Sequence, residues 1–221
     1  YSTIQRNAER ILQLVNQLMD IRKIDKGQMS LMFKKAEIVS FTRDLLETFE
    51  QQTRVKKLDL KFHTSAPEIE MWIDPKNFDK IILNLLSNAC KFTPENGQVE
   101  ISLSTGEDTH LPQNAPLRRY VELTVADSGI GIASTEREHI FERFYQIRNS
   151  QNNSNIGTGI GLHLTRSLVE LHYGNIHVED NGEGRPGSRF IIRLPLGKEH
   201  LNIEEIDDNP VGNNTPVHIT T

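Results

Sequence analysis

The stretch Ile156-Gly157-Thr158-Gly159-Ile160-Gly161-Leu162-His163-Leu164 decides how the rest of the sequence is interpreted. Three glycines at alternate positions lead into an apolar pattern of helical spacing, which continues at Leu168 and Leu171. Glycines let backbone N–H groups approach an anion, and a helix N-terminus adds a partial positive charge. The stretch therefore predicts either a phosphate-binding turn or a flexible turn into a packed helix, and the residues upstream have to decide between them.

The composition limits the classes of protein to which the chain can belong. Its 221 residues suffice for one good-sized domain with an appendage, and its net charge of −5 argues against a nucleic-acid partner. The single cysteine, Cys90, suits a reducing compartment. Because there is no signal peptide and no apolar run long enough to cross a bilayer, we expect a soluble, cytoplasmic chain. Tyr1 already lies within a helical pattern, which leaves open a membrane-anchored parent protein.

Residues 1–27 predict one helix with a coiled-coil-like apolar seam. The seam alternates spacings of four and three and consists of Ile4, Ala8, Ile11, Val15 and Leu18. Such a helix cannot bury its apolar stripe alone, so it either packs on the following domain or joins a bundle between chains. The seam spacing favours the bundle, and Gly27 marks the end of the helix.

The rest of the chain predicts an α/β (α+β) two-layer sandwich, in which three helices cover a mixed β-sheet. Helices are expected at 41–55, 74–92, 134–145 and 160–171. Strands are expected at 58–62, 71–73, 99–103, 120–126, 176–178 and 189–194. We place a connector at 28–36, with a short extended piece within 28–40. The main domain is expected at 37–197, and a linker or disordered tail at 198–221.

The second of these helices carries a polar cluster. Asn84, Asn88 and Lys91 are spaced so that all three project from one helix face. Two carboxamides and an ammonium group can hold a hydrated Mg²⁺ ion and phosphate oxygens, because Mg²⁺ prefers oxygen ligands. The alternative is a solvated helix end. The apolar neighbours Leu85 and Leu86 indicate a largely buried helix, so its polar face should line something.

Two more segments combine glycines or aromatic residues with charge. Asp127-Ser128-Gly129-Ile130-Gly131-Ile132 follows a predicted strand. Its aspartate can accept a hydrogen bond and its glycines allow a flat ligand to approach, although a simple turn has the same composition.

Phe141-Glu142-Arg143-Phe144 precedes a polar loop at 146–156. Arg143 can neutralise a phosphate or form an ordinary surface ion pair.

Together these segments resemble the sequence boxes of sensor histidine kinases. The N box corresponds to Asn84-Leu85-Leu86-Ser87-Asn88-Ala89-Cys90-Lys91-Phe92-Thr93-Pro94. The G1, F and G2 boxes correspond to 127–131, 141–144 and 157–162, in the family's order. The resemblance covers residues 37–197 and implies an ATP-binding catalytic domain of the Bergerat type. The helix at 1–27 resembles the second helix of the family's dimerisation and histidine-phosphotransfer domain, and the phosphoacceptor H box is not in the sequence.

The resemblance also implies roles for individual residues. Those that contact ATP are Asn84, Asn88, Lys91, Phe92, Asp127, Gly129, Gly131, Ile132, Phe144, Gly157, Thr158, Gly159, Gly161 and Leu162. Those with a direct part in catalysis are Asn84, Asn88, Lys91 and Arg143. Asp127 would bind the adenine amino group, Asn84 and Asn88 would hold Mg²⁺, and residues 146–156 would form a lid. The implied partners are a second copy of the chain and a response regulator receiver domain, which in a hybrid kinase would follow the tail.

Three functions fit this resemblance. A histidine kinase transfers the γ-phosphate of ATP to a histidine of a dimerisation helix, for relay to an aspartate of a response regulator. ATPases of the gyrase and heat-shock chaperone type usually have a glutamate base where this sequence has Asn84, and an amide cannot take a proton from water. Asn84 therefore favours the kinase, in which the acceptor imidazole is itself the nucleophile. A non-catalytic, dimeric nucleotide-binding signalling module stays open.

Overall fold

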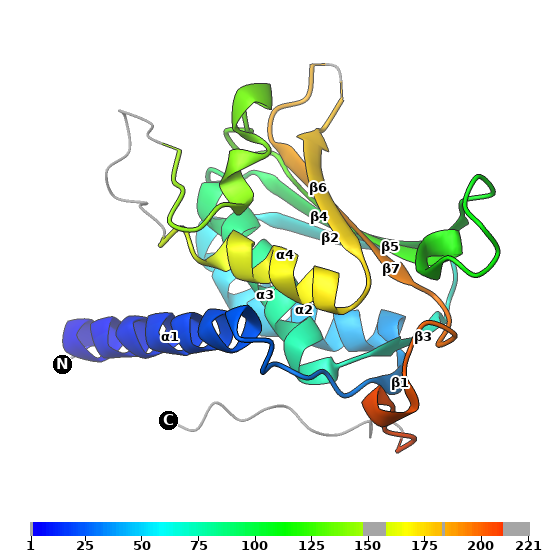
Figure 1. Ribbon diagram of the computed structural model, residues 1–221. Helices are drawn as coiled ribbons and strands as arrows, with labels where there is room; N and C mark the ends of the chain where they lie inside the picture. Colours follow the sequence, from blue (N-terminus) through cyan, green and yellow to red (C-terminus); the bar gives the residue numbers. More distant parts are fainter. Residues whose placement is uncertain (1, 148–157, 183, 210–221) are drawn as a thin grey trace.

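The computed structural model describes residues 2–147, 158–182 and 184–209 (Figure 1). A five-stranded sheet has the order β2-β4-β5-β7-β6, in which β2 and β4 are parallel and the other neighbours are antiparallel. Its strands are β2 (Asp59–Thr64), β4 (Gln98–Glu107), β5 (Arg119–Asp127), β6 (Asn175–Asp180) and β7 (Ser188–Pro195). One face is covered by α2 (Ile38–Lys56), α3 (Pro75–Phe92) and α4 (Gly161–Leu171) (Figure 1). The predicted two-layer sandwich with a mixed sheet and three helices is confirmed.

Helix α3 is the centre of the core. Its apolar residues recur at helical spacing, and five of them are almost completely buried: Phe78, Ile81, Ile82, Leu85 and Leu86. On the sheet, alternate residues of β4 and β5 face these helices, as their two-residue period requires. Asp74 caps α3 as predicted, because its Oδ1 accepts a hydrogen bond from Asn77 N at 3.0 Å. A rigidly packed α3 gives its polar face a fixed position.

A second, two-stranded sheet joins the connector to the domain. Strand β1 (Lys34–Glu37) pairs antiparallel with β3 (Glu70–Ile73). The sequence predicts β3 as a strand and a short extended piece where β1 lies. The Glu37 carboxylate accepts hydrogen bonds from Val39 N at 2.9 Å and Ser40 N at 2.7 Å. This cap starts α2 at Ile38, three residues earlier than the apolar pattern indicates.

The predicted helix at 134–145 is wrong. The structure has two short 3₁₀ turns there, η2 (Ser134–Glu136) and η3 (His139–Phe141). Only Ile140 and Phe141 of this segment are buried, and two adjacent residues do not make a helical stripe. Phe144 ends the segment with a positive φ of 61°. The polar residues before the buried pair therefore have no core contact that would hold a longer helix.

Helix α1 (Ser2–Asp25) extends away from the sandwich (Figure 1). Its last turns pack on the domain, where Ile21 is buried and Asp20 Oδ2 lies 2.6 Å from Lys80 Nζ. Most of the seam is exposed, with 76% of Ile4 and 61% of Ile11 accessible. The end of α1 therefore belongs to the domain, whereas association of the free part with a second copy stays a prediction.

The sequence predicts a linker or disordered tail from residue 198, and the structure differs over 198–209. Phe33 of the connector forms a parallel bridge with Ile206, and Phe33 N donates to Glu205 O at 2.7 Å. Lys34 and Asp207 form an ion pair at 3.0 Å. Phe33 and Lys34 are far from residues 198–209 in the sequence, so the composition of this segment alone does not reveal these contacts. Residues 210–221 lie outside the described residues.

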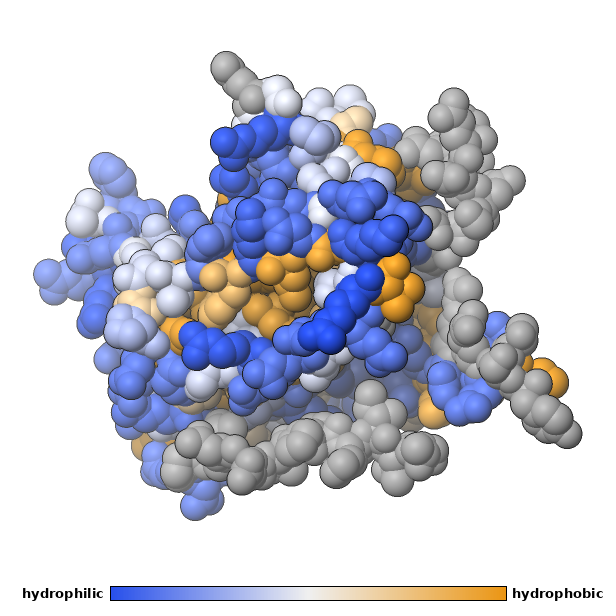
Figure 2. Space-filling view, turned by 180° about the vertical axis from the view of Figure 1, so that it is seen from behind, coloured by the Kyte–Doolittle hydropathy of each residue, from blue (hydrophilic) through white to orange (hydrophobic). Residues whose placement is uncertain are grey.

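The face of the molecule that lies behind the view of Figure 1 carries apolar side chains in its middle, surrounded by hydrophilic ones (Figure 2). No helix in the described part of the chain is long and apolar enough to span a membrane.

Candidate functional site

The carboxylate of Asp127 lies at the end of β5 and is 5% exposed. Its Oδ1 accepts a hydrogen bond from Gly129 N at 2.8 Å, and its Oδ2 accepts one from the Ser188 hydroxyl at 2.6 Å. Burial raises the pKa of Asp127, and the hydrogen bonds from Ser188 and Gly129 oppose that change. Since a carboxylate has about four acceptor positions, this one can accept a further hydrogen bond from a ligand.

The turn after Asp127 packs against the end of α3. A Cβ added to Gly129 would lie 2.6 Å from Phe92 O, so this close approach requires glycine. Gly131 follows with a φ of 72°, and Gly131 and Ile132 are half-buried. Asn181 holds the strand end from the other side, because its Nδ2 donates to Asp127 O at 2.6 Å. The predicted G1 segment is therefore fixed against the predicted N box.

The polar face of α3 meets the start of α4. Asn84 Nδ2 donates to Thr165 Oγ1 at 2.7 Å, whereas the half-buried Asn88 side chain makes no hydrogen bond with any described residue. Lys91 Nζ lies 4.8 Å from the centroid of the Phe92 ring, a cation–π contact, and Phe92 is 39% exposed. The structure thus groups the predicted N-box residues along one edge of α3, between α4 and the Asp127 turn.

Lys56, at the end of α2, holds the C-terminal end of α3. Its Nζ donates to the main-chain oxygens of Cys90 at 2.7 Å, Lys91 at 3.0 Å and Thr93 at 2.9 Å. These carbonyls have no partner within their own helix, and the helix end carries a partial negative charge that an ammonium group stabilises. Lys56 therefore fixes the position of Lys91 and Phe92 in the candidate site.

Among the described residues, the hydrogen-bond partners of Arg143 lie on α1 and α4 and not on the α3 edge. Its guanidinium forms two hydrogen bonds with the Asp25 carboxylate at the end of α1, one of them at 2.8 Å, and its Nε donates to His163 Nε2 at 2.8 Å. The hydrogen bond from Arg143 holds the pKa of Asp25 below its ordinary value. Of the two alternatives for Arg143, the structure favours the ion pair, which joins α1 to the start of α4.

The predicted F and G2 boxes meet through their backbones. Phe144 N donates to Gly159 O at 2.9 Å, and the Phe144 ring is 64% exposed. Thr158 Oγ1 accepts a hydrogen bond from Ile160 N at 3.3 Å. Gly161 and Leu162 begin α4. Gly157 and most of the predicted lid, residues 148–156, lie outside the described residues.

Four positioning residues escape sequence analysis because their partners are distant along the chain. They are Lys56, Thr165, Asn181 and Ser188. Ser188 faces Asp127 across the β5–β7 pair, and only the strand register reveals this. Thr165 lies four residues after Gly161 on the same face of α4, so the G2 segment could have indicated that Thr165 lies near the site.

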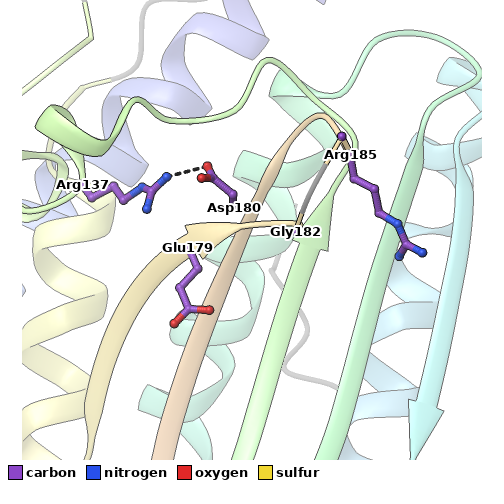
Figure 3. A pocket seen from close by; sticks show the side chains of 6 residues that line it. Arg137, Glu179, Asp180, Gly182 and Arg185 are labelled. Atoms are coloured by element: carbon purple, nitrogen blue, oxygen red, sulfur yellow. Dashed lines mark ion pairs between the residues drawn. The ribbon is translucent and has the colours of Figure 1, made fainter.

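A separate hollow lies at the β6–β7 hairpin (Figure 3). Arg137 and Asp180 point toward each other and form an ion pair at 2.5 Å, and Arg185 points away from them (Figure 3). The lining includes Glu179 as well, so two carboxylates balance two guanidinium groups. This hollow contains none of the predicted site residues, and its charge does not favour an anionic ligand.

Residues 73–198 match the family model described as histidine kinase-, DNA gyrase B-, and HSP90-like ATPase, which is more than half of the chain. The chain belongs to this family. As a histidine kinase-type ATPase domain, it has relatives among named sensor kinases. It is 38% identical over 196 residues to sensor histidine kinase TmoS of Ectopseudomonas mendocina, covering 89% of this chain and 19% of that protein. It is 32% identical over 206 residues to histidine kinase P4 of Formosa agariphila, covering 92% of this chain and 14% of that protein.

Solved structures support the same assignment of the ATPase domain. The catalytic domain of histidine kinase ThkA superimposes with a TM-score of 0.61 at 25% identity, covering 76% of this chain and 99% of that one. Full-length ShkA in complex with AMPPNP superimposes with a TM-score of 0.69 at 25% identity, covering 88% of this chain and 37% of that one. The chain therefore spans less than a fifth of TmoS and P4, and most of the isolated ThkA catalytic domain.

Proposed function

We propose that this domain binds Mg-ATP and transfers the γ-phosphoryl group to a histidine of a dimerisation helix. One observation carries the proposal. The buried Asp127 carboxylate, the Phe92 end of α3 and the Asn84 contact with α4 form one continuous edge, held by direct contacts at each step. Such an edge offers an acceptor for the adenine amino group at one end and a helix N-terminus for phosphate at the other.

The residues present fit a magnesium ion. Among the described residues no group of three or more His, Cys, Asp or Glu side chains could hold a metal, so the ligands would be carboxamide oxygens. Asn84 and Asn88 would hold Mg²⁺, and Asn88 has no competing hydrogen bond within the described chain. When bound, Mg²⁺ would neutralise charge on the phosphate oxygens, and several waters would complete its shell.

The transfer reaction asks this domain mainly to position its substrate. A nitrogen of the acceptor imidazole attacks the γ-phosphorus, a new N–P bond forms, and the bond to the β-phosphate oxygen breaks to release ADP. Lys91 and the N-terminus of α4 bind phosphate oxygens. Water is a poor competitor, because the amide of Asn84 cannot remove its proton. This favours the kinase over a gyrase- or chaperone-type ATPase.

The proposed partners follow from the same assignment. A second copy would associate through the exposed seam of α1, and the phosphoryl group would pass to the receiver domain of a response regulator. ThkA, which has this fold, has been crystallised in complex with response regulator protein TrrA. A membrane-anchored or hybrid parent protein is compatible with a domain that spans a small part of its relatives.

A labelling experiment tests the transfer step. The chain is incubated with γ-labelled ATP and Mg²⁺, alone and extended at its N-terminus by the segment that precedes it in its gene. We expect acid-labile label only on the extended protein, and its loss in Asn88→Ala. Release of phosphate to water would support the ATPase instead. An extended protein that binds ATP and stays unlabelled would support the non-catalytic module.

A further inference from the structure

The hydrogen bond between Asn84 and Thr165 is a polar contact between α3 and α4. Thr165 is 1% exposed, on the second turn of α4, and its Oγ1 is 2.7 Å from Asn84 Nδ2. A buried hydroxyl at a helix interface is usually retained only when it has a partner, because an unpaired one destabilises the fold. The pair is therefore a fixed contact between α3 and α4.

The Thr165 hydroxyl can accept from an amide NH₂ or donate to an amide oxygen, so the other neighbours of the Asn84 carboxamide decide which way it faces. With Nδ2 directed to Thr165, Oδ1 faces Gly161, the first residue of α4, and a Cβ there would lie 2.4 Å from that oxygen. The unpaired N–H groups and partial positive charge at a helix N-terminus favour an oxygen over an NH₂ group in this place. Hydroxyl and glycine together hold the carboxamide in one orientation before any ligand binds.

Asn88, one turn further along the same face, differs in this respect. Its half-buried side chain makes no hydrogen bond with the described residues, so no hydrogen bond in that part of the chain fixes its orientation. The two carboxamides of the candidate metal site are therefore unequal: within the described chain, that of Asn84 has a hydrogen-bond partner and that of Asn88 has none.

We propose that Thr165 is a positioning residue that presets the Asn84 oxygen for Mg²⁺, while Asn88 turns toward the ion only on binding. This inference rests on the proposed function. A ligand whose supporting contacts hold it in place binds without losing rotational freedom at that moment. Removing the Thr165 hydroxyl should therefore weaken the magnesium-dependent part of nucleotide binding and leave the contacts to adenine unchanged.

The test compares dissociation constants for AMPPNP in Mg²⁺ and in EDTA, by calorimetry. For Thr165→Val we expect a three- to tenfold weaker affinity in Mg²⁺, about the value of one buried hydrogen bond, and less than a twofold change in EDTA. Thr165→Ser keeps the hydroxyl and should restore the wild-type value in Mg²⁺. Thr42→Val is the matched control, because Thr42 is fully buried and its hydroxyl has no hydrogen-bond partner among the described residues.

A purely structural role for Thr165 would weaken binding equally in both buffers, and that result, or no change in either, overturns the inference. If wild-type protein does not bind AMPPNP at all, the proposed function fails as well, so the two failures are distinguishable. Should Thr165→Val not fold, NMR on the wild type decides. One Asn84 side-chain NH proton, assigned by its loss in Asn84→Ala, should show the small temperature coefficient of a hydrogen-bonded amide. A solvent-like coefficient overturns the inference.

Discussion

Ser188→Ala removes the hydroxyl that supports the Asp127 carboxylate. In the native protein the Ser188 hydroxyl donates to Asp127 Oδ2 at 2.6 Å, and both residues are 5% exposed. Burial raises the pKa of Asp127, and the bond from Ser188 is the largest influence that opposes this change. In Ser188→Ala, Asp127 stays buried but loses the hydrogen bond from Ser188, so the pKa of Asp127 should rise further.

The consequence for nucleotide binding depends on pH. The ionised carboxylate is a stronger acceptor for the adenine amino group than the protonated carboxyl, because hydrogen bonds to charged groups are the stronger ones. A hydrogen bond to a charged group contributes about 1.5–3 kcal/mol, which is roughly a tenfold to hundredfold change in an equilibrium constant. We therefore expect Ser188→Ala to weaken ATP binding by up to about tenfold at pH values between the Asp127 pKa of the wild type and that of the variant. The effect should become small at higher pH, where Asp127 is ionised in both proteins.

The assay is a titration with AMPPNP and Mg²⁺ between pH 5 and pH 8. The acid limb of the affinity profile should lie at higher pH in Ser188→Ala than in the wild type. Ser128→Ala is the matched control, because Ser128 lies next to Asp127 but its hydroxyl accepts from Gln98 N at 2.8 Å. Its acid limb should stay in place. A uniform loss of affinity at every pH in Ser188→Ala would refute the reasoning and leave Ser188 with a packing role.

Three further predictions concern other parts of the domain. Burial raises the pKa of Asp79 from 3.8 to about 6. The folded protein therefore loses stability as the pH rises through that value and the buried carboxyl ionises. Asp79→Asn should raise the free energy of unfolding in urea by about 1–2 kcal/mol at pH 7, half of the full ~3 kcal/mol because the group is partly exposed, and not at pH 4. Asp25→Asn should speed hydrogen exchange in the last turns of α1, because it removes the ion pair with Arg143 that holds this end of the helix. Unchanged exchange would contradict this role of the ion pair. Lys56→Met should lower stability by about 1–2 kcal/mol in thermal melts and weaken nucleotide binding, whereas Lys57→Met, beside it and exposed, should do neither.

The elements that sequence patterns predict correctly are those whose signals are local. Asp74 and Pro75 mark the start of α3, and alternation marks β4 and β5. Strand β1 has no such signal, because it depends on pairing with β3. At 134–145 helix-forming residues are present, but only an adjacent apolar pair is buried, and tertiary packing decides the outcome.

The candidate site divides in the same way. Asp127 and the α3 amides could be named from the motifs, because the residues within each motif are close together in the sequence. The residues that support them, such as Lys56 and Ser188, could not be named in this way. Lys56 reaches carbonyls 34 to 37 residues away, and Ser188 is 61 residues from Asp127. Asp25, the acidic partner of Arg143, is 118 residues away, on a helix whose packing the seam alone leaves undecided.

The central claim is that Asp127 recognises adenine in a magnesium-dependent nucleotide site. The most direct measurement is calorimetric titration of the wild type and of Asp127→Asn with Mg-ATP and Mg-GTP at pH 7.5. A carboxylate accepts from the amino group of adenine and repels the carbonyl oxygen that guanine has in its place. The wild type should bind ATP at one site and discriminate against GTP, and Asp127→Asn should lose at least about tenfold in ATP affinity and most of the discrimination. Absence of binding at millimolar ATP, or equal ATP affinity in both proteins, would contradict the account.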